Sequence, residues 1–478
     1  MKSRYKCFRT IFFAALISLS GLFVSCSTES GADFVPERIE KFTVYDFNLD
    51  EAYEIYAELL YERNHCLVWA EIGSGIDTRT AREIATTYDN DILGALLRGF
   101  GLDNIQGKGS IMQIASEIVY GHPNGKLDIL LFDIKDWWDP NNPQFGYIYG
   151  FFNDEDFFSK ETFPDSNERL IIYMDSNPGG PDDPEFYDTI AHELQHLMNF
   201  TASIEFRNSN EMDIWINEGL SAAAEWIYTR QYLQRRIDRY NLDPAGSIAQ
   251  GNNFFVWDER NDSDYLGDEY ATVYLFFQWL RLQAGTSRIF GDIITSPYMD
   301  QRAVTTAFHK HATAKGLDQW DTMLKSWLAA NHINAPSGIY GYLNEPRLNT
   351  IKTIPTSETG LRLYPGEGVY SMTNSSNQWP ATGQTGGQSM RYAGLQKSPP
   401  ELNETEVFTS DGSVLMSYNI NNIVEYDDNY NVLTQPELAY TTGLPVPAAA
   451  RAAASLSNLS GPERIDARDI LRQRGRNK

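Results

Sequence analysis

Two of the chain's seven histidines stand four residues apart in the segment HELQH, residues 192–196. Two aspartates and a proline just before this segment are typical of a helix start, so one helix is predicted over 185–200. On that helix His192 and His196 lie on one face, with β-carbons about 5–6 Å apart. Glu193 projects about 100° away from them. Any fold of this chain therefore has to accommodate two imidazoles side by side on one helix.

This spacing lets both imidazoles reach one small cation, and a catalytic zinc site needs a third protein ligand. Glu218 lies 22 residues beyond His196, on a second predicted helix, and is the expected third ligand. Glu225 lies two turns further along the same face, where it could accept a hydrogen bond from a ligand histidine. Two alternatives stay open. The histidines could bond to backbone in a core helix, at a desolvation cost, and Glu225 could be solvated.

The remaining histidines have weaker patterns. Two of them are two residues apart in FHKHA, which is the wrong spacing for one helix face, and the others stand alone. All five are expected to be structural: His65, His122, His309, His311 and His332.

Composition narrows the possible partners. The 478 residues suffice for two or three domains, and 42% hydrophobic with 13% aromatic residues is typical of a folded protein. The net charge of −25 argues against a nucleic-acid partner. Cys66 is expected to be a small core hydrophobe, with no internal disulfide in the chain.

The N-terminus has the pattern of an export signal. Four positive charges in MKSRYKCFR precede an apolar run that is too short to span a bilayer, so residues 1–25 are predicted to be a signal peptide. The run ends in FVSC, which resembles a bacterial lipobox although Phe23 stands where leucine is typical. Cys26 is therefore expected to carry lipid and to anchor the chain at the cell envelope, on the periplasmic face or the cell surface. Secretion after ordinary cleavage is the alternative.

Strand-like segments precede helical ones, which predicts an α+β domain. A first helix is predicted within 43–63, and an amphipathic one from Thr80 to Leu97. Strands are predicted at CLVWAEI (66–72), LDILLFDI (127–134), FGYIYGFF (145–152) and LIIYMD (170–175). Later helices are predicted at 213–237, 268–284, 301–312 and 317–331. Residues 350–435, rich in Thr, Ser, Asn and Gly, have short strand-like runs.

HELQH followed by WINEGLSAAAE resembles the gluzincin metallopeptidases, which pair HExxH with a Glu in an Asn-Glu-Gly-type motif. GIDTRTAREIATTYDNDI, LDILLFDI, GYIYGFF and ERLIIYMDSNP before AHELQHLMNF are similar to the hyicolysin family of secreted bacterial metallopeptidases. The resemblance covers about residues 65–345. It implies a gluzincin-like catalytic domain with a sheet-containing N-terminal half and a helical C-terminal half. It also implies one zinc ion bound by His192, His196 and Glu218, with Glu193 as general base.

The aminopeptidase N-type gluzincins carry an acidic residue seven beyond the glutamate ligand, which Glu225 matches, although the spacing from HExxH to that ligand is longer here. They also place a transition-state tyrosine just before an apolar helix that ends in a Leu ten residues later. Leu280 lies ten beyond Tyr270, so the match falls on Tyr270 rather than Tyr265, without the Lys-Gly that follows in those enzymes. The alternative is that Tyr270 is a packing residue with its hydroxyl in water.

The resemblance implies a zinc endopeptidase of the cell envelope that acts on proteins or peptides. The chain lacks the Gly-x-Met-Glu-Asn stretch with which aminopeptidase N-type enzymes hold a substrate amino terminus, which disfavours amino-terminal trimming. The alternative is a catalytically silent, metal-containing surface lipoprotein that binds partners as an adhesin does.

The predicted domains are a signal peptide (1–25), a tether (26–36), a metallopeptidase domain (37–345), a β-rich accessory module (346–435) and a flexible basic tail (436–478).

Overall fold

The computed structural model contains one compact unit within Glu37–Lys478. The residues it describes are 38–121, 125–139, 141, 147–244, 246–251, 254–257, 263–374, 388–396, 408, 413–425 and 432–446. The predicted signal peptide, the tether with Cys26, and the predicted tail from residue 447 onward lie outside these residues. Among the helices in the described part of the chain, none combines the length and the apolar character that a membrane crossing requires.

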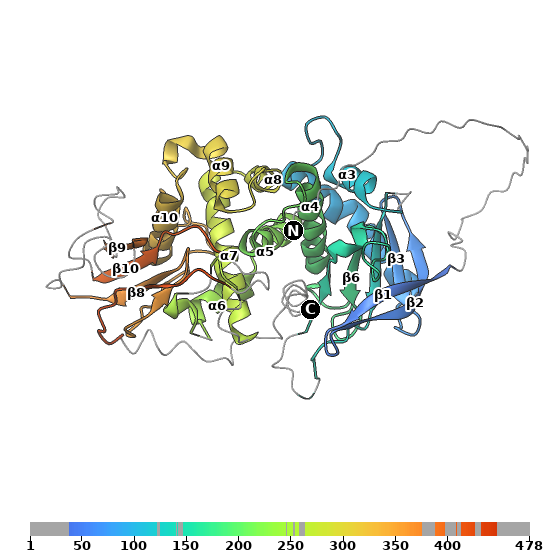
Figure 1. Ribbon diagram of the computed structural model, residues 1–478, viewed down its shortest axis with the longest axis horizontal. Helices are drawn as coiled ribbons and strands as arrows, with labels where there is room; N and C mark the ends of the chain where they lie inside the picture. The colour runs from blue at the N-terminus through green and yellow to red at the C-terminus, as the bar shows by residue number, and fades with distance from the viewer. Residues whose placement is uncertain are drawn as a thin grey trace, which may run out of the picture. The chain divides into compact units, whose positions relative to one another are not determined.

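A six-stranded sheet forms the N-terminal half (Figure 1). Its order is β1-β2-β3-β4-β6-β5, in which β3, β4 and β6 run parallel and the other neighbours antiparallel. The strands are β1 Ile39–Asp46, β2 Glu51–Glu62, β3 Cys66–Glu71, β4 Leu127–Phe132, β5 Gly150–Phe151 and β6 Ile171–Asp175. Three predicted strands are thereby confirmed as β3, β4 and β6, and β5 lies within the fourth, at one edge of the sheet.

The predicted helix within 43–63 is wrong, because these residues form the antiparallel pair β1 and β2. Phe42 pairs with Ile55 across the two strands, and Val44 pairs with Tyr53. The side chains of β2 that point into the core are every second one: Ile55, Ala57, Leu59 and Tyr61. The true period is two, as in a half-buried strand. Strand pairing overrides the helix propensity of the Ala, Glu and Leu residues here.

The amphipathic helix predicted from Thr80 to Leu97 is confirmed as a helical stretch interrupted by a π-helical turn. It consists of α1 Thr78–Thr87, the π turn Tyr88–Ile92 and α2 Leu93–Phe100. Helix α1 packs against β2 and β3, and the short helix α3 Ile111–Ile118 packs against α4.

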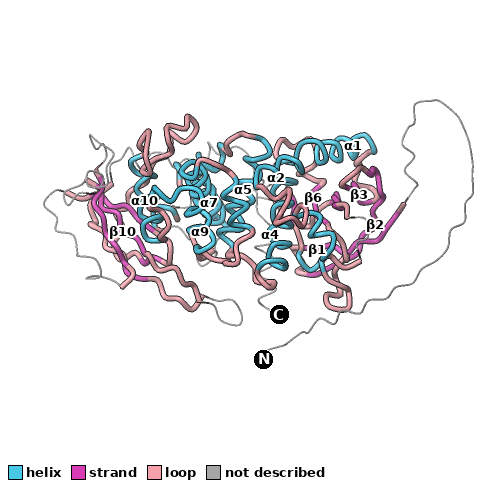
Figure 2. The backbone as a smooth tube through the Cα atoms, turned by 90° about the horizontal axis from the view of Figure 1, so that it is seen from above, coloured by secondary structure: helices cyan, strands magenta, loops and turns pink. Residues whose placement is uncertain are grey.

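The C-terminal half is mostly helical. Its helices are α4 Phe186–Phe206, α5 Ile214–Thr229, α6 Gln234–Leu242, α7 Ser263–Ala284, α8 Arg288–Ile294, α9 Gln301–Ala312 and α10 Trp320–Ile333. Helix α4 contacts β5, β6 and α5. Helix α5 in turn lies beside α7 (Figure 2). The predictions for α4, α7, α9 and α10 are confirmed, whereas α8 was not predicted.

The prediction of a single helix over 213–237 is also wrong, because these residues belong to two helices. Arg230 ends α5 in a left-handed conformation (φ 58°), and its backbone N–H donates to the carbonyl of Trp226. The backbone N–H of Leu233 donates to the Tyr274 hydroxyl of α7 at 2.9 Å. A tertiary hydrogen bond thus fixes the break, and residues 229–234 contain no glycine or proline that would predict it.

A second sheet of order β8-β10-β9 follows the helices. It consists of β8 Gly368–Met372, β9 Met390–Leu395 and β10 Val414–Asn419, while β11 Glu437–Leu438 pairs with β7 Arg362–Leu363. The Tyr370 hydroxyl donates to the Leu328 carbonyl at 2.7 Å, which fastens β8 to α10. The predicted α+β class is confirmed, and the domain boundary near residue 345 stays a prediction.

Candidate metal centre

Helix α4 carries the HELQH segment through the interior. Its position between the edge of the first sheet and the helical half buries nearly every side chain from Ile190 to Ser203, the polar ones included. His192 is 1% exposed and His196 is fully buried. Since a buried polar side chain needs a partner, the two imidazoles must be matched from a neighbouring element.

Helix α5 supplies that partner. Trp215 anchors the start of this helix in an aromatic core, with ring centroids 4.9 Å from Phe254 and 5.8 Å from both Phe276 and Trp320. Glu218 lies nearly one turn further on and is fully buried. The anchoring of Trp215 therefore fixes the side of α5 from which Glu218 reaches α4.

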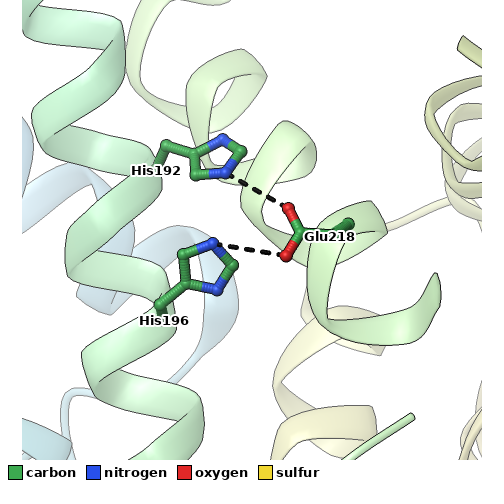
Figure 3. Close-up of side chains that lie close together, drawn as sticks. All are labelled: His192, His196 and Glu218. Atoms are coloured by element: carbon green, nitrogen blue, oxygen red, sulfur yellow. Dashed lines mark ion pairs between the residues drawn. The ribbon is translucent and has the colours of Figure 1, made fainter. Parts of the chain in front are cut away.

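The carboxylate of Glu218 bridges the two histidines (Figure 3). Its Oε2 lies 3.4 Å from Nε2 of His192, and its Oε1 lies 3.6 Å from Nε2 of His196. Possible ligand atoms from the three residues all lie within 4.8 Å of one another. The structure thus brings together the three residues that the sequence predicted as ligands.

These distances fit a small cation such as zinc. Ligands bound about 2.0–2.1 Å from a tetrahedral zinc lie about 3.3–3.4 Å from one another. The nitrogen-to-oxygen separations of 3.4 and 3.6 Å are close to that value. Two imidazoles and one carboxylate are also a ligand set typical of catalytic zinc. Among the described residues, no second group of three or more such side chains has this arrangement.

The outer nitrogen of His192 has an acidic partner. Its Nδ1 lies 2.7 Å from Oε1 of Glu225, which is only 6% exposed. The alternative that Glu225 is solvated therefore does not hold. A carboxylate at this position favours the proton on Nδ1, which makes Nε2 the ring nitrogen that can bind a cation.

His196 has a neighbour that the sequence analysis missed. The Ser221 hydroxyl lies 3.1 Å from Nδ1 and 3.2 Å from Nε2 of His196, and it also donates to the Gln195 side chain. Ser221 is three residues beyond Glu218, so it faces the same side of α5. That spacing was the available signal, but a lone serine in a helix carries too little information to be selected by pattern.

Glu193 and Tyr270, the predicted general base and oxyanion donor, are both interior. Glu193 is 1% exposed beside His192. Tyr270, on α7, is 2% exposed, lies edge-on to Trp257 at 5.0 Å between ring centroids, and has the Arg236 guanidinium 4.6 Å from its ring centre. The alternative that its hydroxyl lies in water does not fit this burial. The catalytic roles of both residues stay predictions.

Four of the remaining histidines have contacts outside this centre. His65, His309 and His311 lie 3.3, 3.5 and 2.6 Å from aspartate oxygens, and Nδ1 of His332 lies 2.8 Å from the Thr353 hydroxyl. His122 lies outside the described residues. These contacts agree with the structural roles expected of them.

The chain is similar to a metalloprotease. It is 28% identical to the neutral metalloprotease ShpI of Staphylococcus hyicus over 351 residues, which are 72% of this chain and 73% of that protein. No protein-family model matches the chain. The similarity supports the resemblance to metallopeptidases, while membership of the hyicolysin family in particular stays a prediction.

Proposed function

We propose that this protein is a zinc-dependent endopeptidase. The observation that carries the proposal is the buried cluster of His192, His196 and Glu218, whose nitrogen-to-oxygen distances suit a zinc ion. The similarity to a protein named as a neutral metalloprotease supports the same reaction class. One zinc ion per chain is proposed, with proteins or peptides as substrates.

Glu193, Tyr270 and Glu225 each have a role in the proposed hydrolysis. A zinc ion held by His192, His196 and Glu218 would supply Lewis-acid chemistry at the scissile carbonyl and would lower the pKa of a water towards about 7. The Glu193 carboxylate takes a proton from the attacking water and passes it to the leaving amine. The Tyr270 hydroxyl donates a hydrogen bond to the developing oxyanion. Glu225 orients the His192 ring through Nδ1.

Strand β5 lies at the edge of the first sheet. Strand β5 ends the sheet order, so one side of it is not paired within the sheet. It lies against the HELQH helix, because a β-carbon at Gly150 would come within 3.0 Å of the Thr189 side chain. Both residues of β5 are buried, so strand addition is not proposed at this edge, and the preference for cleavage within chains rests on the sequence. The missing Gly-x-Met-Glu-Asn stretch supports the same preference.

The N-terminal pattern supports export and a lipid anchor at Cys26 on the bacterial cell envelope. Changing Cys26 to Ser should move the protein from the detergent phase to the aqueous phase in a Triton X-114 partition of cells that make it. Equal partitioning of the two proteins would overturn the anchor and leave secretion as the route.

Casein hydrolysis tests the activity and separates it from a silent binding role. The full-length protein should cleave casein, lose activity with 1,10-phenanthroline, and regain it when zinc is added. The matched variant is Glu193→Gln, which should keep its zinc but cleave about 10²–10⁴-fold more slowly. A zinc-loaded wild-type protein that cleaves no faster than this variant would support the binding lipoprotein instead.

A further inference from the structure

A buried amide pair joins the two helices that carry the candidate ligands. Nδ2 of Asn199 on α4 donates to Oδ1 of Asn217 on α5 at 2.5 Å. Asn199 lies nearly one turn beyond His196, and Asn217 directly precedes Glu218. Both amides are buried, at 4% and 3% exposure. The contact therefore links the residue that directly precedes the carboxylate ligand with a residue nearly one turn from a histidine ligand.

Arg207, the residue that caps the end of α4, decides which way the Asn199 amide points. Its Nη2 donates to both the side-chain Oδ1 and the backbone carbonyl of Asn199, each at 3.0 Å. A guanidinium has only donors, so it must face the amide oxygen. The amide NH₂ group then has to face Asn217, and the alternative flipped orientation would place two donors together.

The position of Arg207 is itself fixed by neutral acceptors. Nη1 donates to the Ile294 carbonyl at 2.5 Å, and Nε donates to the Asn210 carbonyl at 3.2 Å. Burial lowers the pKa of Arg207 to about 10, so the side chain remains charged at neutral pH. Burying a guanidinium that donates only to neutral carbonyl and amide oxygens costs desolvation free energy. Such a group can specify one arrangement of the neighbouring elements. Here the contacts of Arg207 connect α8 with α4, and the bond from Asn199 to Asn217 extends the connection to α5.

We infer that Asn199, oriented by Arg207 and bonded to Asn217, is a positioning residue that sets the spacing between the helices carrying His196 and Glu218. This inference rests on the zinc site proposed above. Without the amide bond, α5 could shift against α4, and the Glu218 oxygens would leave the distances that suit a zinc ion. The predicted result is weaker zinc binding with the ligands themselves unchanged.

Zinc affinity of the full-length, metal-stripped protein tests this role by competition with a chromophoric chelator. Asn199→Leu and Asn217→Ala should bind zinc about 10–100-fold more weakly than the wild type, the scale for residues that orient metal ligands. The second variant leaves the Asn199–Arg207 contact intact, and it decides the test should the first fail to fold. Asn217→Asp keeps an acceptor for Asn199 and should bind close to wild-type affinity.

The control is Asn331→Leu on α10, which removes another fully buried amide, one that accepts from the Tyr342 hydroxyl at 2.6 Å. It should lower the urea stability of the metal-free protein but leave zinc affinity and the visible spectrum of the cobalt-substituted protein unchanged. Wild-type zinc affinity in both test variants, or an equal loss of affinity in Asn331→Leu, would overturn the positioning role. A wild-type protein that binds no zinc would instead overturn the zinc site, and this inference with it.

Discussion

Nδ1 of His192 on α4 lies 2.7 Å from Oε1 of Glu225 on α5, and both side chains are buried. The contact holds the ring with Nε2 towards Glu218. We predict that Glu225→Ala binds zinc about 10–100-fold more weakly. Glu225→Gln should lose less, because its amide oxygen can still accept from Nδ1–H. Titration of the metal-free variants with zinc measures both, and equal affinity in Glu225→Ala and the wild type would remove this role.

Tyr270 tests the proposed oxyanion contact. Its hydroxyl acts mainly in the transition state, so Tyr270→Phe should lower kcat about 10²–10³-fold while KM and zinc content change little. The comparison variant is Tyr265→Phe, which should turn over at the wild-type rate. Steady-state kinetics on a quenched fluorescent peptide give both values. Normal turnover by Tyr270→Phe with a crippled Tyr265→Phe would move the role to Tyr265.

The sequence predicted those features of the fold and the site that short motifs mark, and it missed features that depend on contacts between separate segments. The helical spacing within HELQH and the resemblance of WINEG to a glutamate-ligand motif predicted the cluster of His192, His196 and Glu218 that the structure brings together. The helix predicted within 43–63 failed because its strand period was masked by good helix formers. Ser221 and Asn199 were missed, because no motif marks them and their contacts with another helix appear only in the folded structure.

Asp156 predicts a pH dependence of stability in the N-terminal half. Burial raises the pKa of its carboxyl to about 7, although the Tyr173 hydroxyl and the Asn167 backbone N–H donate to it and oppose the shift. In the unfolded chain the pKa is about 3.9. Between these values the folded state binds more protons, so the free energy of unfolding falls as pH rises, by up to about 1.4 kcal/mol per pH unit. Above about pH 7 both states are ionised and this contribution to the slope ends.

The variant Asp156→Asn isolates that contribution. Urea unfolding of the chelator-treated protein from pH 5 to 8 removes the separate effect of metal binding. The wild type should lose stability towards pH 7 relative to the variant, and the two curves should run parallel above it. Parallel curves across the whole range would show that Asp156 does not titrate in this window.

The central claim is that His192, His196 and Glu218 bind one zinc ion. Metal content after exhaustive dialysis, measured by inductively coupled plasma mass spectrometry, tests it most directly. The control is Glu205→Ala, which removes a carboxylate of α4 that pairs with Lys108 away from the cluster. We predict one equivalent of zinc in the wild type and in Glu205→Ala, and much less in Glu218→Ala. A full equivalent retained by Glu218→Ala, or no zinc in the wild type, would contradict the account.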